Sequence, residues 1–116
     1  MTGGPWVMSA MIGARTESDA LELVEHIEIA AARELVLVIH VVRGDWEGSI
    51  PLRVLGHSPT EERVARLDLD LALADAREAA GRVVVPLALE QLQQGVYWFD
   101  VVVGETNMTR VPLVVR

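Results

Sequence analysis

The chain of 116 residues lacks cysteine, and its few aromatic residues are three Trp, one Tyr and one Phe. Without cysteine there is no disulfide framework, no thiol catalysis and no cysteine-ligated zinc or iron–sulfur site. Lysine is also absent, which excludes Schiff-base chemistry and the lysine of a P-loop. The chemistry that remains must come from carboxylates, arginine, histidine and hydroxyl groups.

Positive charge is scarce as well. Ten basic residues stand against seventeen acidic ones, for a net charge of −7. Nucleic acids and anionic membranes both require positive charge on a binding protein, so neither is an expected partner. No apolar run reaches the roughly 18–20 residues that span a bilayer. No basic segment precedes Trp6–Ala14 as a secretory signal requires. We therefore expect a cytoplasmic protein.

The residues that are present predict a single domain over 1–116 with a sizeable core, since 51% of them are apolar. From Glu34 onward, runs with a period of two alternate with turns, a pattern typical of a sandwich or barrel. The predicted strands are Leu35–Val42, Ile50–Leu55, Leu67–Leu73 and Val83–Leu89, and the residues predicted as connections are Arg43–Ser49, Gly56–Thr60 and Asp75–Gly81. Pro51 and Pro86 lack an N–H and belong at a strand start or an edge.

The first third of the chain carries a weaker signal. Trp6–Ile12 fits an opening strand. Ala20–Ala32 carries two patterns, one with the spacing of a helical face and one with the alternation of a strand. Consistency with the β-rich remainder favours the strand.

The last part of the chain predicts a closing β-hairpin. Two β-rich runs, Gly95–Val103 and Met108–Arg116, flank a turn-forming segment at Gly104–Asn107. The run from Leu92 to Tyr97 resembles the tyrosine corner of immunoglobulin-like and fibronectin-type sandwiches. In those folds the Tyr hydroxyl hydrogen-bonds to the backbone just upstream.

The order of elements over the whole chain is similar to that of a bacterial family of short, uncharacterised sandwich proteins. The similarity includes the early strands, the long apolar strand, the Gly44–Ser49 turn and the terminal hairpin. The resemblance implies an all-β fold, a single antiparallel β-sandwich of about seven or eight strands with immunoglobulin-like architecture. It supplies no catalytic residues.

No motif predicts an enzyme, a cofactor or a metal centre. His26, His40 and His57 share no ligand spacing. The serines include no Gly-x-Ser-x-Gly elbow. An enzyme with a carboxylate-based site is the weakest of the functional hypotheses.

Two segments are candidates for a small ligand. The Asp45-Trp46-Glu47 loop combines an aromatic ring that could stack on a sugar with two carboxylates. Asp68 and Asp70 share one face of a strand, where alternating carboxylates could bind calcium. A solvated face with Arg66 as a local partner, and a Trp46 that packs on the core, explain the same residues without a ligand.

The sharpest prediction concerns the faces of three strands. If Tyr97, Phe99, Leu35 and Val111 face the core, a second set of apolar side chains faces outward. Immunoglobulin-like sandwiches commonly place the three corresponding strands in one sheet, so these side chains would merge into one patch. Its members are Val36, Val38, Val96, Trp98, Val102 and Val114. Large apolar patches usually mark interfaces.

These observations predict a non-enzymatic interaction module that binds a protein partner, as a homodimer or an accessory subunit. A sandwich that binds carbohydrate or calcium is the alternative. A competing explanation of the patch is that an N-terminal segment or helix of the same chain covers it.

Overall fold

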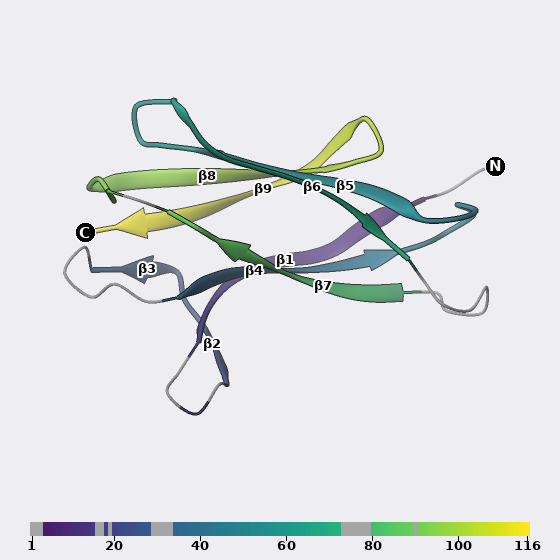
Figure 1. The fold of residues 1–116 in the computed structure, drawn as a ribbon, viewed down its shortest axis with the longest axis horizontal. Coiled ribbons are helices and arrows are strands. Elements are labelled where there is room, and N and C mark those ends of the chain that lie inside the picture. Colours follow the sequence, from purple (N-terminus) through teal and green to yellow (C-terminus); the bar gives the residue numbers. More distant parts are fainter. Residues whose placement is uncertain (1–3, 16–17, 19, 29–33, 73–79, 90) are drawn as a thin grey trace.

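The strands form two sheets packed face to face in a computed structural model, drawn in Figure 1. The structure describes residues 4–15, 18, 20–28, 34–72, 80–89 and 91–116. Nine strands and no helix occur in these residues. The strands are β1 (Trp6–Arg15), β2 (Leu21–Leu23), β3 (His26–Ile27), β4 (Leu35–Val42), β5 (Ile50–His57), β6 (Arg63–Leu71), β7 (Ala80–Leu87), β8 (Gly95–Val103) and β9 (Thr106–Val115).

The two sheets differ in strand order. Sheet A is four-stranded, in the order β2-β1-β4-β7, and sheet B is five-stranded, in the order β3-β9-β8-β5-β6. Every pairing is antiparallel except that of β3 with β9, which is parallel. The predicted all-β sandwich is therefore confirmed. The strand number exceeds the expected seven or eight because the segment before residue 29 supplies two short strands.

That early segment crosses from one sheet to the other. Leu21–Leu23 pairs with the end of β1, and the chain then passes through Val24 and Glu25 to pair with β9. The N–H of Val24 donates to the carbonyl of Ile12 in sheet A, and the N–H of Val114 donates to the carbonyl of Glu25 in sheet B. The strand interpretation is thus confirmed over the described part of 20–32. Residues 29–32 lie outside the described residues.

The core lies between the two sheets and follows the predicted alternation. On β8 and β9 the inward positions hold Tyr97, Phe99, Val111 and Leu113, each at most 9% exposed. β4 contributes its odd-numbered residues from 35 to 41 to the same cluster. Burial of these side chains is the main favourable term for the fold, at about 25 cal/mol per Å² of apolar surface removed from water.

The tyrosine corner is present. The phenolic oxygen of Tyr97 accepts a hydrogen bond of 2.8 Å from the backbone N–H of Gln93. The predicted hairpin is also present, with Gly104 at a positive φ of 64° in the turn between β8 and β9.

The prolines lie where the missing N–H is tolerated. Pro51 is the second residue of β5 and pairs only with β6, since the pairing with β8 begins at Leu52. Pro86 lies on β7, an edge strand of sheet A.

Two predicted connections are shorter in the structure. Gly56 and His57 belong to β5, and Ala80 and Gly81 belong to β7. Leu73 and the connection at 75–79 lie outside the described residues.

Candidate interaction surfaces

The outer face of sheet A is apolar. Strand pairing sets Gly13 of β1 beside both Leu23 of β2 and Val36 of β4, and it sets Met11 beside Val38. Because directly paired residues point to the same side of a sheet, their side chains form rows across the outside of the sandwich. We call this surface the apolar face of sheet A. Its apolar side chains are Trp6, Met8, Met11, Leu21, Leu23, Val36, Val38, Val42, Val84 and Pro86.

Much of this face is exposed. Leu23 is 63% exposed and Met8 is 70% exposed. Val36 and Val38 lie in the middle of the sheet and are buried although they point away from the core. A Cβ placed on Gly13 would lie 3.6 Å from Cγ2 of Val36, which shows how closely β1 flanks that side chain. The large protruding side chains therefore come from β1 and β2, and Pro86 of β7 is exposed as well.

A polar row crosses the middle of the apolar face of sheet A, and Arg15 lies beside Leu21 at one end of the face. Ser9 Oγ lies 2.9 Å from His40 Nδ1, and Arg82 is paired with His40 from the other side. A serine nucleophile needs a base that is oriented by a third group. No carboxylate among the described residues contacts His40 in this structure. Ser9 and His40 therefore resemble the nucleophile and the base of a hydrolytic site, but no described carboxylate orients the histidine.

The outer face of sheet B is charged, and its centre is Asp100. Arg110 Nε donates to Asp100 Oδ1 at 2.7 Å, and His57 Nε2 lies 3.1 Å from Oδ2. The Arg110 guanidinium also lies over the Trp98 ring, with Cζ 5.6 Å from its centroid. The aspartate is consequently only 5% exposed although it points outward.

The charges around Asp100 shift its titration. The hydrogen bond from Arg110 holds the pKa of the Asp100 carboxyl below its ordinary value, against burial, which raises it. The charge of Arg110, the Asn107 side chain and His57 lower it further. In turn Asp100 raises the pKa of Arg110. The pair therefore stays ionised and forms a fixed structural link between β8 and β9.

A shallow hollow of about 490 Å³ lies beside this cluster. Trp98, Arg110 and His57 form one side of it, and the turn after β5 forms the other. Ser58 organises that turn, because its Oγ accepts hydrogen bonds from the N–H groups of Thr60 and Glu62. Glu61 in the same turn has a positive φ of 66°.

The predicted six-residue patch does not exist as one surface. β4 pairs with β1 and β7 in sheet A, whereas β8 and β9 lie in sheet B. Val36 and Val38 therefore lie on the outer face of sheet A, and the other four residues lie on the outer face of sheet B, on the opposite side of the sandwich. Those four are Val96, Trp98, Val102 and Val114. Trp98 is 37% exposed and lies beside the charged cluster.

The predicted ligand residues are engaged in local contacts. Asp68 Oδ1 accepts a 2.7 Å hydrogen bond from Arg53 Nε, and its Oδ2 lies 3.3 Å from Arg66 Nε. The Arg53 hydrogen bond lowers the pKa of Asp68. Two guanidinium groups on one carboxylate oppose a calcium ion electrostatically. Asp70 is paired with Pro51, two residues beyond the pair of Asp68 with Arg53.

The Asp45-Trp46-Glu47 loop closes one end of the core. Trp46 packs against the core cluster, and its indole N–H donates to the carbonyl of Ser49 at 2.9 Å. Asp45 and Glu47 are exposed on either side. The Trp46 ring is therefore partly covered, which leaves less of it for stacking on a sugar.

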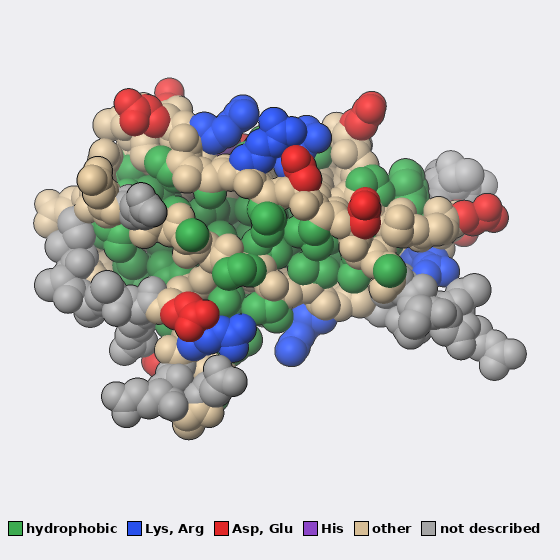
Figure 2. Space-filling model, viewed as in Figure 1, with side chains coloured by type: hydrophobic (Ala, Val, Ile, Leu, Met, Phe, Trp, Pro, Cys, Tyr) green, Lys and Arg blue, Asp and Glu red, His purple; other side chains and the backbone are tan. Residues whose placement is uncertain are grey.

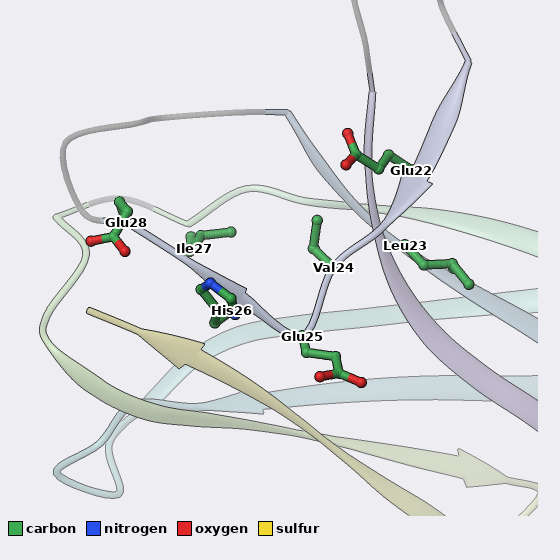
Figure 3. A pocket seen from close by; sticks show the side chains of 7 residues that line it. All are labelled: Glu22, Leu23, Val24, Glu25, His26, Ile27 and Glu28. Atoms are coloured by element: carbon green, nitrogen blue, oxygen red, sulfur yellow. The ribbon is translucent and has the colours of Figure 1, made fainter.

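A second hollow, of about 500 Å³, lies along the crossing from sheet A to sheet B (Figure 3). Figure 3 shows that the carboxylates of Glu22, Glu25 and Glu28 point in different directions. No cluster of three potential metal ligands occurs among the described residues. These residues also include no helix that is long and apolar enough to cross a membrane.

The sequence interpretation missed the protruding half of the apolar face. Trp6, Met8, Met11, Leu21 and Leu23 were not among its candidate residues, although all five are large apolar residues in predicted strands. The signal that could have identified them is that Leu35–Val42 has apolar residues on both of its faces. A strand that is apolar on both faces is expected in the middle of a sheet, next to other strands with an apolar outer face.

Comparison with known proteins identifies the fold. No protein-family description matches the chain. No curated protein sequence matches it either. The crystal structure of an immunoglobulin-like protein from Pseudomonas aeruginosa is similar, with a TM-score of 0.61 over 99% of this chain and 98% of that chain. The sequence identity is 13%, so the likeness shows the fold alone. The chain is an immunoglobulin-like β-sandwich, as the tyrosine corner predicted.

Proposed function

We propose that this immunoglobulin-like sandwich is a non-enzymatic interaction module that docks a protein partner on the apolar face of sheet A. One observation carries the proposal. Eight large hydrophobic side chains are exposed in the described residues, and five of them lie on β1 and β2. The clustering of these five on one face distinguishes them from the scattered apolar residues of an ordinary surface.

The size of the face supports an interface. Seven residues in each of β1, β4 and β7, rising by about 3.3 Å each on strands spaced by about 4.8 Å, cover roughly 330 Å² in projection, and the three-residue β2 adds to this area. Monomeric soluble proteins rarely expose apolar patches beyond a few hundred Å² unless the patch has a function. Trp6, Met8 and Met11 also belong to the residue types that are enriched at protein interfaces.

The opposite face contrasts with this one. The outer face of sheet B carries Val96, Trp98, Val102 and Val114 as well, but charges of both signs, paired through Asp68 and Asp100, divide its apolar residues. Of these four side chains, only Trp98 is among the large exposed ones in the described residues. The asymmetry between the two faces therefore favours the apolar face of sheet A as the docking surface.

The experiment uses two variants with the same change in charge. Leu23→Arg places a cation on the apolar face, and Thr106→Arg places one at the exposed hairpin end. Proteins captured from the native cells by the wild-type chain are compared with those captured by each variant. We expect a partner that Leu23→Arg loses and Thr106→Arg retains, and we expect slower amide exchange on β1 and β2 in the complex. Capture that Leu23→Arg leaves intact, or protection confined to sheet B, contradicts the proposal.

A further inference from the structure

The edges of the two sheets differ in how well they are protected from additional strands. An edge is blunted by shortness, by proline, by a bulge or by charged side chains, and charges protect least where they complement those of the incoming strand. β2 and β3 are three and two residues long. β7 contains Pro86, and β9 contains Pro112 together with a bulge at Met108. The free part of β1 has a bulge at Met8.

β6 is the exception. In the described part of the chain it pairs only with β5, and no strand is hydrogen-bonded to its second edge, although part of β6 lies close to β7. A bulge at Val64 opens the strand, and regular pairing then runs from Ala65 to Leu71 without a proline. The inward side chains of this stretch are all apolar, and Leu67 is 39% exposed. Figure 2 shows hydrophobic side chains along the side of the sandwich between the two layers, with charged groups above them.

We propose that β6 pairs antiparallel with β6 of a second copy, joining the two B sheets into one continuous sheet. The pairing is centred on Leu67, so Leu67 faces its own counterpart across the two-fold axis. Ala65 then lies opposite Leu69 of the second copy on the inner face. On the outer face Arg66 lies opposite Asp68 twice, once on each side of the axis.

Charge complementarity selects this register. Arg66 and Asp68 are about half exposed and lie 3.3 Å apart within one chain, between Nε and Oδ2, so each has an exposed side with which to share that contact with a second copy. Opposite charges directly across a strand pair stabilise it, and like charges destabilise it. Centring on Asp68 or Arg66 would set one of these residues against its own counterpart. Centring on Leu69 would set Asp68 against Asp70.

The contact also covers the exposed apolar edge. Leu67 packs against Leu67 of the second copy. Ala65 and Leu69 pack across the junction in the same way, so the two cores become continuous. Obligate and transient homodimers alike are usually built around a two-fold axis, and this arrangement is isologous. The interface consists of main-chain hydrogen bonds, the inner leucines and two exposed ion-pair sites. We therefore expect a dimer that dissociates on dilution and in high salt.

Charge exchange tests the register. The mass in solution is measured by sedimentation over a range of concentrations, and the wild type should reach twice the chain mass of 12.7 kDa. Asp68→Arg sets arginine against arginine, and Arg66→Asp sets aspartate against aspartate. Each variant alone should raise the dimer dissociation constant by about tenfold or more. An equimolar mixture should restore the dimer, because each copy then supplies the charge that the other lacks.

The controls separate the possible outcomes. Asp70→Arg makes the same charge change on the same face of β6 but lies opposite Val64, so its dimer should persist. Leu23→Arg alters the apolar face of sheet A and should also leave the mass unchanged. Recovery in the mixture shows that both variants are folded.

Three results overturn the proposal. They are a wild-type mass that stays at 12.7 kDa at every concentration, a mixture that remains monomeric, and a dimer that Leu23→Arg abolishes while Asp68→Arg does not. The last result would place self-association on the apolar face of sheet A instead. Because partner docking and β6 pairing use different surfaces, failure of one leaves the other testable.

Discussion

The hydroxyl of Tyr97 lies 2.8 Å from the backbone nitrogen of Gln93 and accepts its hydrogen bond. The ring itself is only 2% exposed and belongs to the core between the sheets. One side chain therefore packs on the core and fixes the loop that leads into β8. If the loop separates from the strand, the Gln93 N–H loses its hydrogen-bond acceptor and the Tyr97 ring becomes exposed to water.

Tyr97→Phe removes the hydroxyl and keeps the packing of the ring. We expect the free energy of unfolding to fall by about 1–2 kcal/mol, since the N–H of Gln93 loses its partner in a partly buried position. Urea denaturation measures the change as a lower midpoint with an unchanged slope. A midpoint equal to that of the wild type would show that water replaces the hydroxyl at no cost.

Gly95 begins β8 under a second constraint. Its φ is +131°, and a Cβ built on it would lie 2.7 Å from Cβ of Pro59. Gly95→Ala should therefore destabilise the fold by about 2–4 kcal/mol, from backbone strain and from displacement of the turn after β5. Thermal unfolding compares it with the wild type.

Gly48→Ala is the matched control for Gly95→Ala. Gly48 also has a positive φ, of 81°, but a Cβ there would meet nothing within 4 Å. The control therefore carries backbone strain without a clash. If the two variants lose equal stability, the contact with Pro59 contributes nothing.

The terminal hairpin could be predicted because its signals are local. Gly95, Tyr97 and the turn at Gly104 lie close together in sequence, and the alternation of Tyr97, Phe99 and Val101 determines which side faces the core. The burial of these residues confirms that alternation. Local pattern therefore gave both the strands and the orientation of their faces.

The site could not be predicted to the same degree, because alternation does not say which sheet a strand joins. Val36 and Val38 face outward as predicted, yet β4 lies in sheet A and not beside β8. That assignment depends on contacts between residues far apart in sequence, such as Leu37 with Ile12 and Val85. Asp100 is a related case. Its burial follows from Arg110 and His57, which only the fold brings to it.

Calcium should leave the unfolding temperature of the wild type unchanged. The carboxylate of Asp68 already accepts hydrogen bonds from Arg53 and Arg66, and a divalent cation would have to displace both guanidinium groups. A ligand that binds only the native state raises its apparent stability, so a thermal-shift titration detects binding. An increase that saturates with calcium, and that Asp68→Asn abolishes, would support the ligand-binding alternative.

Asp100 should make the stability of the protein depend on pH in the acid range. The hydrogen bond from Arg110 places the folded-state pKa of Asp100 below its ordinary value, which is that of the unfolded chain. Above about pH 5 the carboxyl is ionised in both states, and its full stabilisation is present. As the pH falls further the unfolded chain binds a proton first, so the stabilisation declines and is lost below the folded-state pKa.

Asp100→Asn should remove this dependence. We expect the variant to be less stable than the wild type by about 1–3 kcal/mol at pH 7, because hydrogen bonds to a buried charged group are lost. The difference should shrink as the pH falls below about 5. Free energies of unfolding measured from pH 7 down to the acid transition test both statements.

Asp68→Asn is the control for Asp100→Asn. The pKa of Asp68 is also lowered, but Asp68 is exposed and its ion pairs are screened by salt. In 1 M salt the effect of Asp100→Asn should persist while that of Asp68→Asn fades, and parallel curves for the wild type and Asp100→Asn would contradict the role assigned to Asp100.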